Sequence, residues 1–165
     1  MFYYSAFEAE TLAYIQGMDL AYQLLWKTQS MGDTTDLSQH ELMHALDNGR
    51  FSLISAGANH EQLRSMLESA KYHITPAVSN YAGSSESMFM VHDPNERDMI
   101  SLAEKYKQQS VVMAEHGLSK RIFTSGPNKG RTRAGRGWSA VASHEGNYIK
   151  VETTDGEHVR FRLEF

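Results

Sequence analysis

The chain has no cysteine, only three prolines and no long apolar run. The lack of cysteine excludes a disulfide framework and any thiolate zinc site, and it is typical of a reducing cytoplasm. The few prolines and the 41% of hydrophobic residues indicate a folded globular protein rather than a disordered one. No stretch approaches about 18 uninterrupted apolar residues, and the N-terminus lacks the basic and apolar regions of a secretory signal. We therefore expect a soluble, cytoplasmic protein that does not engage a membrane.

The charges are unevenly spread along the chain. Residues 1–48 carry seven acids and one base, whereas no acid lies between Glu115 and Glu145. Six bases fall within that acid-free interval, namely Lys120, Arg121, Lys129, Arg131, Arg133 and Arg136. Such a block attracts phosphate, nucleic acid or an acidic protein surface. The alternative is that the acidic N-terminal third folds back and neutralises it.

Apolar periodicity predicts where the helices and strands lie. Helical spacing recurs in four segments, namely 8–27, 38–47, 59–72 and 93–106. Short apolar runs predict strands between them, and the strand at 73–78 is interrupted at Pro76. Alternating residues on both sides of Asp155-Gly156 predict a C-terminal hairpin. The expected fold is α+β, with N-terminal helices, then a mixed sheet with flanking helices, then that hairpin.

The length of 165 residues fits a single domain. We expect it to have four parts, which are an acidic helical extension (1–48), an α/β core (51–116), a basic glycine-rich loop (120–137) and C-terminal β strands (138–165). Four glycines and one proline within 126–137 predict a long mobile loop. Trp138 flanks this loop and offers a ring on which a nucleobase can stack.

The stretch "SQHELMHALDNG", residues 38–49, contains the pattern His-Glu-x-x-His. On a helix, His40 and His44 lie one turn apart and can bind one zinc ion, with Glu41 as general base. No spacing rule selects a third ligand, although Glu61, Glu68 and His60 are candidates. The alternative is an ordinary amphipathic helix whose histidines line its polar edge, and this alternative is favoured.

Three further stretches carry a family resemblance, namely "FSLISAGANHEQLRSMLESAKY", "VSNYAGSSESMFMV" and "ISLAEKYKQQSVVMAE". In order and spacing, residues 51–116 resemble the uncharacterised bacterial and phage proteins grouped as domain of unknown function 3293. The resemblance implies that seven polar residues are neighbours in space, namely Ser55, Asn59, Tyr81, Glu86, Ser87, Gln109 and Ser110. Such a cluster binds a small ligand or satisfies loop backbone groups. The family brings no established activity, and the zinc pattern lies outside the matched region.

These observations leave three hypotheses of different classes. The leading one is a non-enzymatic, phage-type accessory protein that binds a host protein or nucleic acid through the basic loop, in the host cytoplasm if phage-encoded. The second is a zinc-dependent hydrolase that uses His40, Glu41 and His44, with zinc as its cofactor. The third is a small-ligand domain, for example one that binds a nucleotide around Tyr81, Glu86 and Gln109. The sequence does not determine the oligomeric state.

Overall fold

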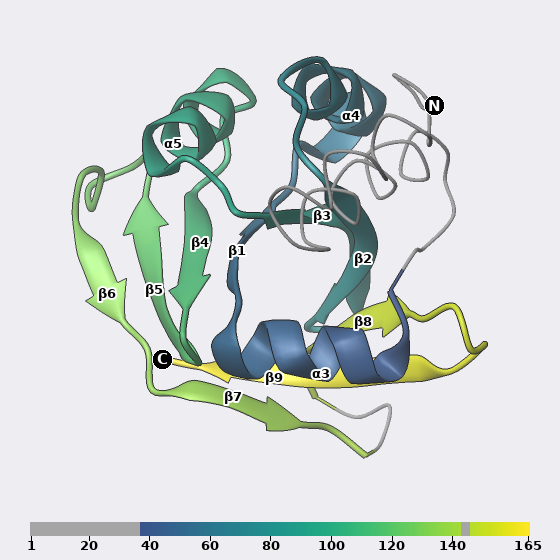
Figure 1. Cartoon of the computed structure of the whole chain (residues 1–165). Coiled ribbons are helices and arrows are strands. Elements are labelled where there is room, and N and C mark those ends of the chain that lie inside the picture. The colour runs from purple at the N-terminus through teal and green to yellow at the C-terminus, as the bar shows by residue number, and fades with distance from the viewer. Residues whose placement is uncertain (1–36, 143–145) are drawn as a thin grey trace, which may run out of the picture.

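The computed structural model describes residues 37–142 and 146–165, which form a curled sheet with helices on both of its faces (Figure 1). The helices are α3 (Gln39–Asn48), α4 (His60–Ser69) and α5 (Glu96–Lys105), with a 3₁₀ turn at Gly57–Asn59. The strands are β1 (Arg50–Ile54), β2 (Ile74–Tyr81), β3 (Ser84–His92), β4 (Ser110–Glu115), β5 (Leu118–Phe123), β6 (Thr132–Ala134), β7 (Gly137–Ala140), β8 (Tyr148–Glu152) and β9 (His158–Glu164).

The strands build one sheet in the order β6-β5-β4-β1-β3-β2-β8-β9-β7. Every pairing between the described strands is antiparallel. Its centre, β4-β1-β3-β2, is formed by the chain order β1-α4-β2-β3-α5-β4, which is the split βαβ arrangement of ferredoxin-like domains. The hairpin strands β5 and β6 extend this centre on one side, and β8, β9 and β7 extend it on the other.

The α+β class predicted from the sequence, with a mixed sheet and N-terminal helices, is wrong. The described part of the chain is mostly antiparallel sheet, with three short α-helices. Strands and helices do alternate between residues 51 and 116, and this alternation indicated a mixed sheet. However, α4 connects β1 to β2 and α5 connects β3 to β4, and in each case a third strand lies between the two. Because that third strand runs the opposite way, the alternation builds an antiparallel sheet.

The predicted helix of residues 8–27 lies outside the described residues. The helices predicted at 38–47, 59–72 and 93–106 are confirmed as α3, α4 and α5, although α5 is capped by Asn95 rather than by Asp93 or Pro94. None of these helices has the length and the apolar character that crossing a membrane requires.

Strand β2 continues through Pro76 instead of being interrupted there. Pro76 faces Phe89 of β3, while the pairing with β8 involves only Val78, Ser79 and Asn80. The proline therefore lies where the β8 side of β2 has no ladder partner among the described strands, so its missing N–H costs no sheet hydrogen bond. β2 then turns into β3 through Ala82 and Gly83, both at positive φ as a two-residue hairpin requires.

The two faces of the sheet carry separate apolar cores. On the outer face, α4 and α5 cover a core that includes Ile54, Leu63, Phe89 and Met99. On the inner face, which is the concave side of the curled sheet, α3 covers a core that is built from both ends of the sheet. It includes Leu42, Leu46, Leu53, Met90 and Phe161. Because α3 covers only part of the inner face, the rest is free to form a cavity.

Residues 132–140, which we call the strap, join the two ends of the sheet (Figure 1). Their first part is β6, which pairs with β5, and their last part is β7, which pairs with β9. Between them, the Gly135 N–H donates to the Ser119 carbonyl at 2.7 Å and the Arg136 N–H donates to the Glu164 carbonyl at 2.6 Å. The interval predicted to be a long mobile loop therefore closes the curled sheet, with a turn only at residues 124–131.

Candidate functional site: a cavity on the inner face

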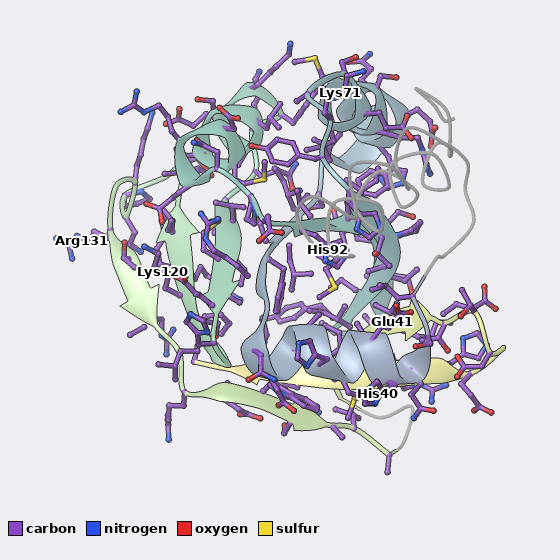
Figure 2. The ribbon with its side chains drawn as sticks, viewed as in Figure 1. His40, Glu41, Lys71, His92, Lys120 and Arg131 are labelled. Atoms are coloured by element: carbon purple, nitrogen blue, oxygen red, sulfur yellow. The ribbon has the colours of Figure 1, made fainter. Side chains whose placement is uncertain are left out.

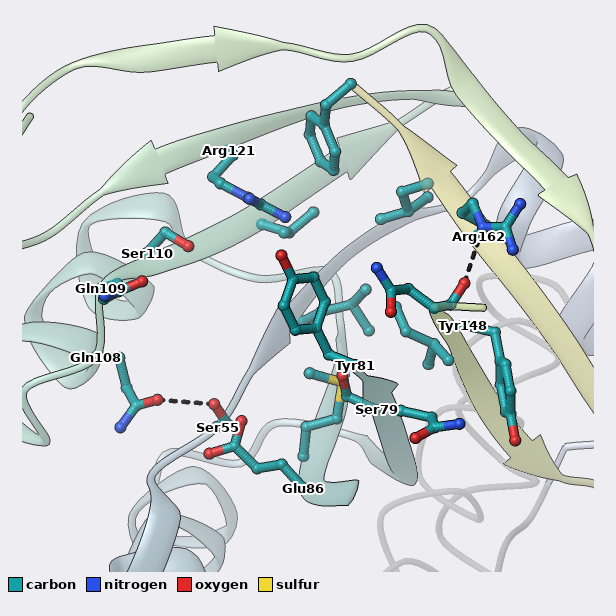
Figure 3. Close-up of a pocket in the computed structure, with 18 of the residues that line it drawn as sticks. Ser55, Ser79, Tyr81, Glu86, Gln108, Gln109, Ser110, Arg121, Tyr148 and Arg162 are labelled. Atoms are coloured by element: carbon teal, nitrogen blue, oxygen red, sulfur yellow. Dashed lines mark hydrogen bonds between the residues drawn. The ribbon is translucent and has the colours of Figure 1, made fainter. Parts of the chain in front are cut away.

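The inner face holds a cavity of about 770 Å³ at the end that α3 leaves uncovered (Figure 3). Side chains from seven strands and from the segment that leads into β4 line it. Its apolar floor is formed by Leu53, Met88, Val112, Ile149 and Phe161. Its rim is polar, and the volume falls within the range of about 300–1,000 Å³ that is typical of small-molecule sites.

Five of the seven residues singled out by the family resemblance line this one cavity, namely Ser55, Tyr81, Glu86, Gln109 and Ser110. Ser87 does not line the cavity, because successive side chains of a strand point to opposite faces. Glu86 of β3 points inward, so Ser87, the next residue, points to the other face. Asn59 lies at the N-terminus of α4, which is on the outer face. The structure thus brings most of this set together, while its role in binding stays a prediction.

Arg121 of β5 is half-buried and points into the cavity (Figure 3). Its guanidinium lies 4.7 Å from the centre of the Phe165 ring. It makes no hydrogen bond or ion pair with any residue that the structure describes, and its Nε is sealed from solvent. Burial lowers the pKa of Arg121, and the neighbouring Arg133 lowers it further. Arg121 is therefore a partly desolvated cation without an acceptor among the residues that the structure describes.

Several polar groups around Arg121 are also without hydrogen bonds to the described residues. The side chains of Tyr81, Gln109 and Ser110 belong to this group, whereas the side chain of Gln108 is hydrogen-bonded within the protein. Gln108 accepts a hydrogen bond from the Ser55 hydroxyl at 2.8 Å and donates one to the Tyr106 carbonyl. The hydrogen-bonded pair Ser55 and Gln108 therefore supports the wall of the cavity. The side chains of Tyr81, Gln109 and Ser110 can form hydrogen bonds with a ligand.

The lining is cationic although the chain carries a net charge of −4. Three basic side chains, those of Lys107, Arg121 and Arg162, stand against one acidic side chain, that of Glu86. Arg162 is held in place because its Nε donates to the Asn147 carbonyl at 2.8 Å. A concave, partly apolar site with an excess of positive charge attracts anions.

The six bases of the acid-free interval do not form one surface. Lys120 pairs with Glu96 at 2.8 Å and Lys129 pairs with Glu104 at 3.4 Å, so two of them lie against α5. Arg121 points to the opposite, inner face. Among the described residues, the partners of these two lysines come from α5, which lies on the same outer face.

Arg131, Arg133 and Arg136 remain exposed on the strap and the turn before it. Figure 2 shows Arg131 beyond the outer edge of β6, pointing away from the sheet. Trp138 does not stand free beside them, because it packs against the inner core and its Nε1 donates to Asp47 at 2.9 Å.

The His-Glu-x-x-His pattern lies on α3, as predicted, with His40 and His44 exposed. Glu41 has a structural contact of its own. Its carboxylate accepts from the Ser38 N–H at 2.9 Å, and the Ser38 hydroxyl accepts from the Glu41 N–H at 3.1 Å. This is a reciprocal capping box, which accounts for a serine three residues before a glutamate at a helix start.

The candidates for a third zinc ligand lie on the other side of the sheet. His60, Glu61 and Glu68 belong to α4, on the outer face, while α3 covers the inner one (Figure 1). His60 stacks on Phe89 at 4.3 Å in the outer layer. Within residues 37–142 and 146–165, no three histidine, aspartate or glutamate side chains are grouped to hold a metal.

The sequence did not single out Ser79, Asn80, Lys107, Tyr148 or Arg162, which also line the cavity. The charge pattern named Arg121, but only as one of the six bases of the acid-free interval, and its inward direction could have been inferred from its position in β5. It stands at an inward position of β5, two residues after the buried Ser119 and in register with Val112. An arginine at such a position is rare unless it is paired or binds a ligand, because burying an unpaired charge is costly.

No protein-family model matches the chain, and no curated protein matches it.

Proposed function

We propose that the protein binds a small anionic molecule in the cavity of the inner face. The observation that carries this proposal is Arg121, a half-buried guanidinium in a cavity of about 770 Å³ with no acceptor among the described residues. A guanidinium offers five donors in a planar fork that matches a carboxylate or a phosphate.

The physical reason is electrostatic. A partly desolvated cation destabilises the empty protein, and an anion that reaches it removes that cost. Each hydrogen bond to a charged group contributes about 1.5–3 kcal/mol. The excess of cations in the lining favours the same ligand class, and the apolar floor favours a ligand with a body as well as a charge.

Substitution of Arg121 by glutamine tests this proposal. We expect a small anion, found by thermal-shift screening of phosphates, carboxylates and nucleotides, to raise the Tm of the natural protein and of Arg131→Gln. Arg131→Gln is the matched control, because it removes the same charge from an exposed position outside the cavity. Calorimetry on Arg121→Gln should show at least about a tenfold loss of affinity. If Arg121→Gln binds every hit as tightly as the control does, the proposal is wrong.

A second candidate follows from Arg131, Arg133 and Arg136, which are exposed and form no ion pair with a described acid. These arginines support the phage-type accessory role, in which the partner would be a nucleic acid or host protein of the cytoplasm. Replacing all three with alanine should weaken binding to single-stranded nucleic acid and reduce its salt dependence. An unchanged salt slope would count against this candidate.

A further inference from the structure

We infer that the ligand of the cavity is a nucleoside monophosphate with an amino-bearing base. The inference rests on the proposed function and specifies its ligand. Three features support it, which are Arg121 of the lining with Arg133 opposite it in the sheet, the exposed ring of Tyr81 and the acidic side chain of Glu86.

The arginine pair is Arg121 on β5 and Arg133 on β6, which face each other directly in the antiparallel register. Arg121 lines the cavity, whereas Arg133 is exposed and is not part of the lining. Like charges at directly opposed positions destabilise a sheet, and Arg133 indeed lowers the pKa of Arg121. Neither arginine forms an ion pair with a described residue. A phosphomonoester carries about −1.5 to −2 charges at neutral pH and three acceptor oxygens, so it can neutralise two guanidinium groups where a carboxylate neutralises one.

The tyrosine is Tyr81, at the end of β2. Its side chain is 67% exposed although it lines the cavity, and in Figure 3 its ring stands between Arg121 and Glu86. An exposed aromatic ring at a binding site offers a flat surface on which a base can stack. The ring of Phe165 does not offer this surface to the same degree, because the Arg121 guanidinium already lies over it.

The carboxylate is that of Glu86, the one acidic side chain among the residues that line the cavity. A carboxylate repels an anion, so its presence in an anion site favours a ligand whose other end donates hydrogen bonds. Figure 3 places Glu86 across the cavity from Arg121, with the side chains of Gln109 and Ser110 along the wall between them. An exocyclic amino group meets this condition, since it donates to a carboxylate, while the amide of Gln109 can donate and accept. Uracil has a carbonyl in place of this amino group and offers only its ring N3–H as a donor at that edge.

The cytidine and uridine monophosphates form a matched pair of probes, because they differ only at one edge of the ring, where cytosine has an amino group and an acceptor nitrogen and uracil has a carbonyl and an N–H. Calorimetry on the full chain should show that cytidine monophosphate binds at least about tenfold more tightly than uridine monophosphate. It should also bind about tenfold more tightly than cytidine, because cytidine lacks the phosphate. Inorganic phosphate should compete with it.

Three substitutions at exposed positions separate the three parts of the site, so loss of folding does not confuse the result. Arg133→Gln should weaken cytidine monophosphate and leave cytidine unchanged. Glu86→Gln should remove the preference for cytidine over uridine monophosphate. Tyr81→Ala should weaken both nucleotides and leave inorganic phosphate unchanged. Arg131→Gln, the control, should change none of these affinities.

Two failures are distinguishable. If no nucleoside monophosphate binds, but another anion binds and depends on Arg121, the nucleotide inference is wrong and the proposed function holds. If the nucleotides bind without dependence on Arg121, both are wrong. Equal affinity for cytidine monophosphate and cytidine would also overturn the inference, because the arginine pair would then have no role.

Discussion

Two histidines of the inner face, His73 and His92, stack on each other with ring centres 4.5 Å apart. The His92 Nε2 also lies 2.8 Å from the Thr75 hydroxyl, within hydrogen-bond distance. Burial, and then the proximity of His73, lowers the pKa of His92 to about 3. His92 is therefore neutral in the folded protein above about pH 3, whereas in the unfolded chain it is charged below about pH 6.5.

This depressed pKa predicts acid sensitivity. Below pH ~6.5 the unfolded chain binds a proton at His92, whereas the folded protein binds this proton only below about pH 3. The stability due to neutral His92 is thus complete above ~6.5 and decreases as the pH falls, by up to about 1.4 kcal/mol per pH unit. Urea unfolding between pH 7 and pH 4 should show a shallower decline in His92→Gln than in the natural protein. His116→Gln, at a side chain that is 79% exposed, should retain the natural slope. Equal slopes in all three proteins would contradict the prediction.

Glu41 allows the capping and zinc interpretations of α3 to be separated. If its main contact is the capping box, Ser38→Ala and Glu41→Ala should each lower the free energy of unfolding by about 0.5–2 kcal/mol. His40→Ala and His44→Ala should change it by less than about 0.5 kcal/mol, because both side chains are exposed. Chemical denaturation checks both statements. Metal analysis of the same proteins after zinc loading is the complementary measurement, and stoichiometric zinc lost in both histidine variants would restore the metal hypothesis.

At the scale of the element, the strap depends on Gly135. A Cβ at this position would lie 2.7 Å from the Glu164 carbonyl oxygen and would also collide with Ser119. Because a backbone atom is involved, rotation of a side chain cannot relieve the contact. Gly135→Ala should therefore destabilise the protein by about 1–3 kcal/mol.

The matched control for Gly135→Ala is Ala134→Ser, which adds one atom at the neighbouring, exposed position of the strap. It should leave the midpoint of unfolding nearly unchanged. Hydrogen exchange in the glycine variant should increase first at Gly135 and Arg136, whose amides bridge the two ends of the sheet. Protection that stays natural at these two amides would show that the strap tolerates the methyl group.

The elements differ in how far the sequence predicts them. The three described helices follow from local periodicity, and α3 also from the Ser38–Glu41 spacing, because all of these signals lie within a few residues. The strand order does not follow, since β1 pairs with β3 and β4, and both lie more than 30 residues further along the chain. Glycines such as Gly135 indicated a loop, although their small size serves a close approach of two strands.

The same limit applies to the candidate site. The resemblance named Ser55, Tyr81 and Gln109, and these line one cavity. The basic pattern named Arg121 but grouped it with Lys120, its neighbour in the chain. In a strand, neighbours point to opposite faces, so Lys120 pairs with Glu96 outside while Arg121 enters the cavity. The sequence therefore gives the charge of each side chain, whereas the face of the sheet to which that side chain points follows only from its place in the strand.

At the scale of the whole molecule, one sheet separates two apolar cores that share no residue. Leu63 of α4 belongs to the outer core and Leu46 of α3 to the inner core. The strands β1, β3 and β4 contribute to both, since alternate residues point to alternate faces. Loss of either core therefore exposes one side of the same strands, and we expect the two cores to unfold together.

Leu63→Ala and Leu46→Ala test this cooperativity. Each removes a fully buried side chain and should lower the free energy of unfolding by about 2–5 kcal/mol. Leu118→Ala is the control, because Leu118 is 64% exposed and should cost less than about 0.5 kcal/mol. In both core variants, urea transitions followed by far-UV and near-UV circular dichroism should coincide, as in a two-state protein. Separate midpoints in Leu63→Ala alone would show that α4 and α5 leave the outer face before the curled sheet opens. In that case the inner face, with its cavity, would be an independent folding unit.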